Sequence, residues 1–203
     1  MDTDPQMAIR LMSPEHPVAR YMHGMGATLL TVSGFLWLGW GYARVLPAVW
    51  EGWLALYVVT AVLLWVSIHA LLVGKRAMHG AAIHVGADMW RAKAAPFKRV
   101  LKAEAIGCGL VVMACLMAER WDLLAVGISL VVGLHFMPLA RVLHFPAYAI
   151  TGFIVVVGAL VSLMYFSGNA LTGAVGAITG ATVWATAIFM LFRLQRLKTA
   201  ALT

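Results

Sequence analysis

Hydrophobic residues come in long runs along this chain, and short polar segments separate them. Six runs approach the length of about 20 apolar residues that a membrane-spanning helix needs. They cover residues 21–42, 53–73, 103–118, 123–143, 147–166 and 170–192. The third run is short, and we expect its helix to extend back over residues 98–102, whose lysines can reach the headgroups. The pattern predicts one all-α membrane domain, a bundle of six transmembrane helices.

Composition agrees with a lipid-embedded chain. Of the 203 residues, 63% are hydrophobic and 11% are charged, whereas a soluble domain carries about 25% charged residues. The net charge of +7 gathers between the apolar runs and at the C-terminus, a pattern that fits contact with anionic lipid headgroups. No basic stripe lies on a soluble module, so the sequence predicts membrane lipids as partners and no nucleic acid.

The distribution of Lys and Arg predicts the orientation of the bundle. With six spans, the N-terminus, the 74–102 segment, the 142–146 turn and the C-terminus share one side of the membrane. Thirteen basic residues fall on that side and only Arg44 and Arg120 on the other. Because cytoplasmic loops are enriched in Lys and Arg, we expect both termini in the cytoplasm. Tryptophan and tyrosine residues gather near the predicted outer ends, as an aromatic belt does.

One connection is long, the segment 74–102. Its Ala, Met and Lys residues favour helix, while Pro96 indicates a break. A short amphipathic helix on the inner leaflet, with Trp90 and Phe97 as anchors, fits this composition. A plain cytoplasmic linker fits it equally well.

Ionisable residues inside a span are costly and are candidates for function. His69 of the second run, Glu104 of the third and His135 of the fourth all lie in the predicted cytoplasmic half. The same half holds Arg141, at the inner end of the fourth span, and two polar residues that begin the fifth span, Tyr148 and Thr151. We therefore expect a polar pocket that opens to the cytoplasm. The competing interpretation is that the histidines only bond backbone carbonyls and that Glu104 pairs with a basic neighbour.

Pro138, three residues after His135, supports His135 as a candidate for function. A proline inside a helix lacks an N–H and clashes with the carbonyl four residues earlier, here that of Leu134. In lipid that carbonyl needs another partner, which water, a side chain or a ligand can supply. Pro138 is therefore included among the pocket candidates, although ordinary spans also bend at proline. Arg141 is most simply an anchor at a helix C-terminus.

Cofactor and metal sites have little support in the sequence. His69 and His135 lie at similar depth on different helices, as bis-histidine haem ligation requires, so haem remains an alternative without a supporting motif. His79, His84 and Asp88 form only a weak metal pattern, and no metal site is predicted. Cys108 and Cys115 are read as buried thiols. No HExxH, GxSxG, P-loop or GxGxxG motif occurs, so catalytic residues are not assigned and an enzyme is disfavoured.

The sixth run is rich in small residues. Gly173, Gly176 and Gly180 lie near one face, and small residues let helix backbones approach closely. We expect this face to pack inside the bundle or across a homo-oligomer interface.

The stretch "LHFMPLARVLHFPAYAITG" resembles a segment of small multi-pass bacterial membrane proteins grouped in families of unknown function. The shared pattern is HFxPLA followed by proline, an aromatic residue and a glycine-containing helix. Here it corresponds to His135, Phe136, Pro138, Leu139, Ala140, Pro146, Tyr148 and Gly152. The resemblance covers under a tenth of the chain. It implies a helical bundle in the bacterial inner membrane and supplies no activity.

Three functions follow as hypotheses. The first is a small-solute or ion transporter or channel that uses the inner-leaflet pocket, with histidine protonation giving pH dependence. The second is a non-catalytic accessory or scaffold subunit. The third is a membrane enzyme or haem protein that uses His69 and His135.

Overall fold

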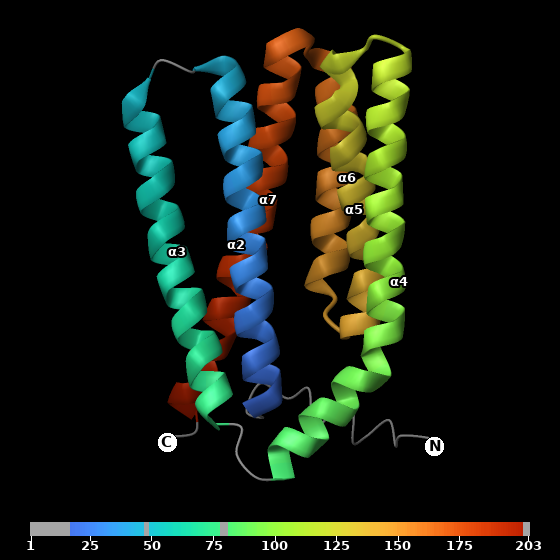
Figure 1. Ribbon diagram of the computed structural model, residues 1–203. Helices are drawn as coiled ribbons and strands as arrows, with labels where there is room; N and C mark the ends of the chain where they lie inside the picture. Colours follow the sequence, from blue (N-terminus) through green and yellow to red (C-terminus); the bar gives the residue numbers. More distant parts are fainter. Residues whose placement is uncertain (1–16, 47–48, 78–80, 201–203) are drawn as a thin grey trace.

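Long α-helices make up the described part of the chain. The computed structural model describes residues 17–46, 49–77 and 81–200, and this part contains no strand. Figure 1 shows the helices side by side, joined by short turns. They are α2 (Pro17–Val45), α3 (Trp50–Ala77), α4 (Ala81–Met117), the short 3-10 helix η1 (Trp121–Leu123), α5 (Leu124–Leu143), α6 (Ala147–Tyr165) and α7 (Gly168–Ala200).

Five of the described helices are long and apolar enough to cross a membrane. The qualifying segments are Trp50–Arg76, Ala94–Met117, Trp121–Leu143, Ala147–Tyr165 and Gly168–Leu194. The chain is thus a helical, multi-pass membrane protein. The first predicted span corresponds to α2, which is not among the five. Polar and small residues are interspersed among the apolar ones of α2, among them His23, Thr28 and Thr31.

The part of the 74–102 segment that lies in α4 is helical, as one of the two expectations had it, and it continues into the third span as one long helix. α4 runs without interruption from Ala81 to Met117, and Pro96 lies inside it. The expectation that Pro96 breaks the helix is therefore wrong. A proline removes one hydrogen bond and kinks a helix, but the helix continues where the bend is accommodated. Figure 1 shows the first part of α4 running obliquely to the rest.

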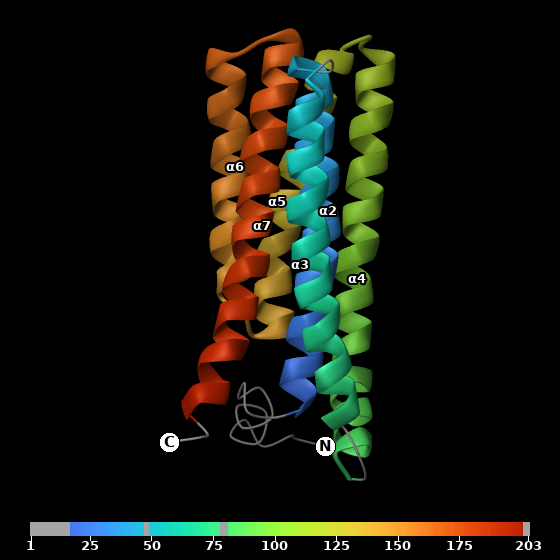
Figure 2. The ribbon, with the colours of Figure 1, turned by 90° about the vertical axis from the view of Figure 1, so that its left-hand side faces the viewer.

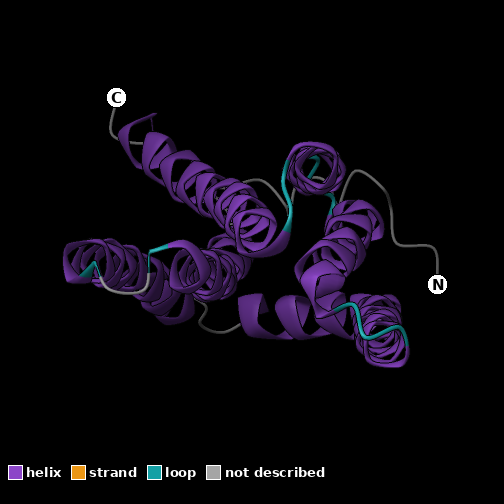
Figure 3. Cartoon of the chain, turned by 90° about the horizontal axis from the view of Figure 1, so that it is seen from above, coloured by secondary structure: helices purple, strands orange, loops and turns teal. Residues whose placement is uncertain are grey.

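The helices run roughly along one axis, as the side view shows (Figure 2). α2 begins, and α7 ends, at the same end of the bundle (the bottom in Figure 1), here called the terminal end. The packing contacts form a series in which each helix lies beside the next, in the order α3, α2, α7, α6, α5 and α4. α3 and α4 therefore lie at the two ends of this series. The view from above (Figure 3) shows the helices spread out across the bundle.

Burial follows that order. In the apolar segment of α7, 50% of the residues are buried inside the bundle, against 6% in that of α4 and 11% in that of α3. Two clusters of buried side chains form the core. One lies in the terminal half around Phe136, Tyr148 and Met190. The other lies toward the opposite end around Trp37, Val126 and Leu171.

The turn between α5 and α6 is built by local backbone geometry. α5 ends at His144, whose φ of 54° and ψ of 41° are left-handed, and the His144 N–H donates to the carbonyls of Ala140 and Arg141. Such a left-handed residue closes a helix C-terminus. Pro146 precedes α6, where a missing N–H costs nothing. The sequence "RVLHFPAY" is thus a helix end, a turn and a helix start.

Candidate functional site

Two of the predicted candidates meet between α4 and α5. Nδ1 of His135 lies 3.4 Å from Oε2 of Glu104, and the side chains are only 8% and 26% exposed. The distance is that of an ion pair when the imidazole is protonated. The His135 Nδ1 atom is not aligned for a hydrogen bond, however. The contact is therefore electrostatic, and a small rotation of either side chain would convert it into a charge-assisted hydrogen bond.

The environment of this pair is apolar on the bundle side. On α5, Phe136 and Leu139 are buried beside His135, and the Phe136 ring meets the imidazole edge-on at 5.7 Å. On α4, the half-buried thiol of Cys108 lies one helical turn from Glu104. A low-dielectric setting strengthens the interaction between an imidazolium and a carboxylate. It also makes either charge costly when it is left alone.

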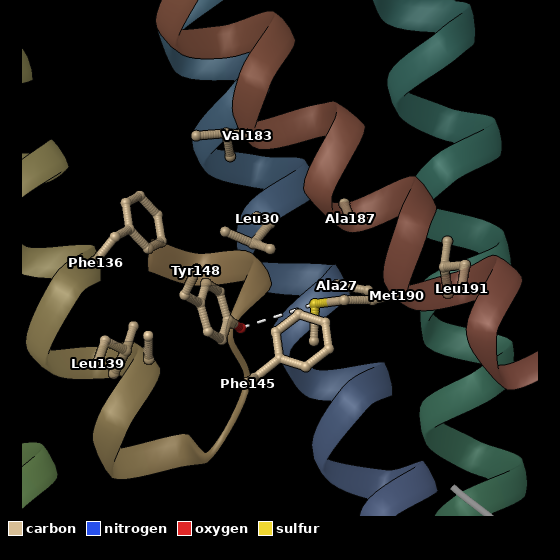
Figure 4. Close-up of a cluster of buried hydrophobic side chains, with 11 residues drawn as sticks. Ala27, Leu30, Phe136, Leu139, Phe145, Tyr148, Val183, Ala187, Met190 and Leu191 are labelled. Carbon is tan, nitrogen blue, oxygen red and sulfur yellow. Dashed lines mark hydrogen bonds between the residues drawn. The ribbon is translucent and has the colours of Figure 1, made fainter. Parts of the chain in front are cut away.

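Tyr148 lies in the terminal-half core and does not face an open pocket (Figure 4). It is 4% exposed. Its ring stacks on Phe136 at 5.6 Å and meets Phe145 edge-on at 5.2 Å. Its hydroxyl donates to the sulfur of Met190 on α7 at 3.8 Å, a weak hydrogen bond. Aromatic rings thus fill the space where the sequence predicted a polar pocket.

Hydroxyl groups tie α7 to its neighbours. Thr151 of α6 is buried and shares a hydrogen bond with Thr186 of α7. Ser129 of α5 is paired in the same way with Thr179 of α7, at 2.8 Å between the two oxygens. Sequence reasoning included Thr151 and missed the partnership of Ser129. The sequence signal that could have predicted this bond is the set of threonines at helical spacing on α7, because buried hydroxyls need a hydrogen-bond partner.

The remaining pocket candidates lie elsewhere. His69 is exposed on α3 and stacks against Trp65 at 6.0 Å. Pro138 and Arg141 are exposed on α5. The structure therefore unites His135 with Glu104, places Tyr148 and Thr151 in the adjacent core, and leaves the other three outside.

The predicted haem ligands are not brought together. His69 lies on α3, whose packing neighbours are α2 and α7, while His135 lies on α5 and faces α4. Within the described residues, no group of three or more His, Cys, Asp or Glu side chains could hold a metal ion. His79, and the side chains of His84 and Asp88, lie outside the described residues.

The predicted packing glycines lie against α2. A β-carbon on Gly176 would stand 2.7 Å from the Cα of Gly41 and from the carbonyl of Trp37. One on Gly180 would stand 2.9 Å from the Gly34 carbonyl, and one on Gly173 would meet the Val45 side chain. Both α2 and α7 thus carry glycine where the two backbones cross. The face predicted to pack inside the bundle or across an oligomer interface is occupied by α2 of the same chain.

Comparisons with known proteins give no family to which the chain could be assigned. No family model, no curated protein and no solved structure matches it.

Proposed function

We propose that this protein is a proton-linked transporter or channel for a small solute or ion, with the His135–Glu104 pair as its proton-binding site. The observation that carries the proposal is the contact of 3.4 Å between a buried imidazole and a half-buried carboxylate. Ionisable side chains within membrane helices are rare and mark proton or substrate pathways. Histidine changes its charge near neutral pH, so it can take up and release protons under cellular conditions.

The position of the pair also favours movement. α4 is the least buried of the five apolar helices, and it packs mainly on α5. Protonation of His135 strengthens its attraction to Glu104, and deprotonation weakens it. A helix held on one side only can shift against its neighbour at low cost, because few contacts are broken. The pair would thus couple its protonation state to the α4–α5 distance.

The orientation belongs to the same proposal. We place α2 as the sixth span and both termini in the cytoplasm of a bacterial inner membrane. Lys75, Arg76, Arg141 and Arg193 are exposed in the terminal half, which supports this orientation through the bias of basic residues toward the cytoplasm. A membrane-impermeant maleimide tests it in a background without Cys108 and Cys115. Ser167→Cys should react in intact cells, and His144→Cys only after lysis.

Proton flux tests the central claim. The purified full chain is reconstituted in liposomes that contain a pH-sensitive dye, and a potassium diffusion potential drives proton entry. We expect internal acidification with the unchanged protein and a loss of at least several-fold with Glu104→Gln or His135→Asn. Asp122→Asn is the matched control, since Asp122 forms an ion pair with Arg120 at the exposed opposite end. Equal flux in all four proteins would refute the proposal.

A second candidate is an accessory subunit of a larger membrane assembly. The observation that favours it is the low burial of α3 and α4, which occupy the two outer positions of the helix series. Large apolar side chains such as Trp65 and Leu110 are exposed there. Both lipid and a partner helix can cover such faces. Co-purification with a stoichiometric partner under mild detergent, combined with absent proton flux, would favour this candidate over the transporter.

A further inference from the structure

An apolar crevice opens between α2, α3 and α7, away from the His135–Glu104 pair. Its volume is about 640 Å³, within the range of about 300–1,000 Å³ that ligand pockets occupy. Its lining contains no charged residue, and half of the lining residues are glycine or alanine. The short side chains of Ala55, Ala174 and Ala177 leave space that larger side chains would fill.

The walls of the crevice are fixed by specific contacts. The Trp184 indole donates from Nε1 to the carbonyl of Thr31 on α2 at 3.0 Å. Gly34 makes room for that ring, because a β-carbon there would collide with it. At the other end, the Tyr42 hydroxyl donates to the carbonyl of Val49 in the α2–α3 turn. The crevice is thus bounded by two aromatic side chains whose polar atoms already have partners.

The dimensions of the crevice decide what it can hold. Along α7 its lining runs from Ala170 to Trp184, which is about 21 Å at 1.5 Å per residue. Along α2 and α3 the lining is shorter, from Leu38 to Val45 and from Gly52 to Val59, which is about 10 Å on each helix. A hydrocarbon chain, whose carbons pack about 4 Å from their neighbours, has a cross-section of about 16 Å² and over 10–21 Å occupies about 160–340 Å³. The crevice volume of about 640 Å³ holds such a chain.

Position supports the same ligand. The crevice begins beside Phe166 and Val45, at the end of the bundle opposite the terminal end, and runs toward its middle. One leaflet of the hydrocarbon core is about 15 Å deep, so the crevice covers that depth. Arg44 and Glu51 flank the α2–α3 turn and are exposed. Their opposite charges suit a zwitterionic headgroup at the surface while its chain enters the crevice.

We propose that this crevice is a binding site for one acyl chain of a zwitterionic phospholipid, taken from the leaflet that contains the α2–α3 and α6–α7 turns. The chain lies between the wall of α3 around Val59 and the alanines of α7, with α2 behind it. Each methylene that leaves other lipid contacts gains close packing against small side chains. A polar solute finds no charged group along the site, and the Tyr42 hydroxyl in its lining already donates to the Val49 carbonyl.

Photo-crosslinking tests the proposal. The full chain is reconstituted in phosphatidylcholine vesicles that contain a small share of phosphatidylcholine with a diazirine in its acyl chain. After irradiation, labelled peptides are quantified by mass spectrometry. We expect labels on residues 170–184 of α7 and 52–59 of α3 to exceed several-fold those on residues 106–117 of α4, which are also largely exposed. Equal labelling of both regions indicates ordinary bulk lipid and overturns the proposal.

A matched pair of variants sharpens the test. Ala177 lines the crevice and Ala181, one turn further along α7, is exposed but does not line it. Ala177→Phe should reduce the crevice labels at least several-fold, whereas Ala181→Phe should leave them unchanged. Ala55→Phe fills the crevice from α3 and replaces Ala177→Phe if that variant does not fold. Labels that resist both filling variants, or crosslinks that join the crevice to another protein, contradict the proposal.

Discussion

The α2–α7 interface and the α4–α5 interface both join two membrane helices, but they do so by different means. At the α2–α7 crossing, Gly41 and Gly176 bring the two backbones together with no room for a β-carbon. At α4–α5, glycine on one helix faces a valine side chain on the other, Gly107 against Val131 and Gly127 against Val111. This interface also holds the contact between His135 and Glu104. One interface depends on shape and the other carries a titratable contact.

The difference follows from the forces that bring helices together in a lipid environment. Lipid chains are as apolar as leucine, so helix association in membranes depends on close packing and on hydrogen bonds. Close glycine packing stabilises one fixed arrangement, because a shift of either helix loses many contacts at once. An interface formed through side chains and a charge-dependent contact can have two arrangements. We therefore expect α2–α7 to be the rigid part of the molecule and α4–α5 the part that responds to protonation.

The largest effect is expected at the glycine crossing. In Gly176→Ala the new methyl group would lie 2.7 Å from backbone atoms of Gly41 and Trp37, which cannot rotate away. Overpacking of this kind costs about 1–3 kcal/mol. The measurement is the unfolding equilibrium of the purified protein in detergent.

Gly109→Ala on α4 is the matched control for that substitution. A β-carbon at Gly109 would have nothing within 4 Å, and alanine favours helix over glycine by about 1 kcal/mol. We expect this variant to be as stable as the original protein or more stable. If both alanine variants lose similar stability, close approach is not what holds α2 to α7.

A smaller effect is expected for the hydrogen bond between Ser129 and Thr179, which links α5 to α7. The two oxygens are 2.8 Å apart and buried. Interhelical hydrogen bonds in membrane proteins contribute about 0.6 kcal/mol on average and up to about 1.7 kcal/mol. A double-mutant cycle of Ser129→Ala and Thr179→Val should give a coupling energy in that range.

The control for the cycle uses Thr182, whose hydroxyl donates to the carbonyl of Ile178 within α7. Ser129→Ala combined with Thr182→Val should be additive, because the two residues share no bond. A coupling energy of the same size in this second cycle would show that the coupling in the first does not come from the Ser129–Thr179 bond.

Replacing the His135–Glu104 pair should change stability less still. Substituting apolar side chains of similar size for a buried ion pair is often neutral or stabilising. We therefore expect the double variant His135→Phe with Glu104→Leu to unfold at about the same midpoint as the original protein, while proton flux is lost. A large loss of stability in this variant would mean that the pair holds α4 in place and has no need of a transport role.

The helical membrane character was predictable because about 20 apolar residues in a row have few other stable structures in water or lipid. The α5–α6 turn was predictable for a similar reason, since Pro146 limits where a helix can begin. Pro96 was misread because a kink and a helix end share the same local signal. What decided between them was the surrounding chain, which stays helical on both sides.

The candidate site was predictable only in part. The sequence identified His135 and Glu104 as costly residues in the same predicted half of the membrane, and the structure places them in contact. His69 is also an ionisable residue in that half of the membrane, but it is exposed on α3. The depth of a residue in the membrane does not say which way its side chain points around the helix. Tyr148 was expected to line a pocket because its hydroxyl is polar, yet its ring packs with Phe136 and Phe145. Which face of each helix meets which neighbour is a property of the whole bundle.

The smallest effect is expected at the ion pair between Arg120 and Asp122, whose side chains are 57% and 36% exposed, in contrast to the buried pair. The guanidinium donates two hydrogen bonds of 2.9 Å to the carboxylate, and these bonds raise the pKa of Arg120. Both side chains face water at the opposite end from the termini, where solvent and salt screen their attraction. Asp122→Asn should leave both the unfolding midpoint and the proton flux unchanged, at low and at high salt. A change in flux from this variant would mean that charge anywhere on the chain alters the assay, and the loss expected for Glu104→Gln could then not be assigned to the buried pair.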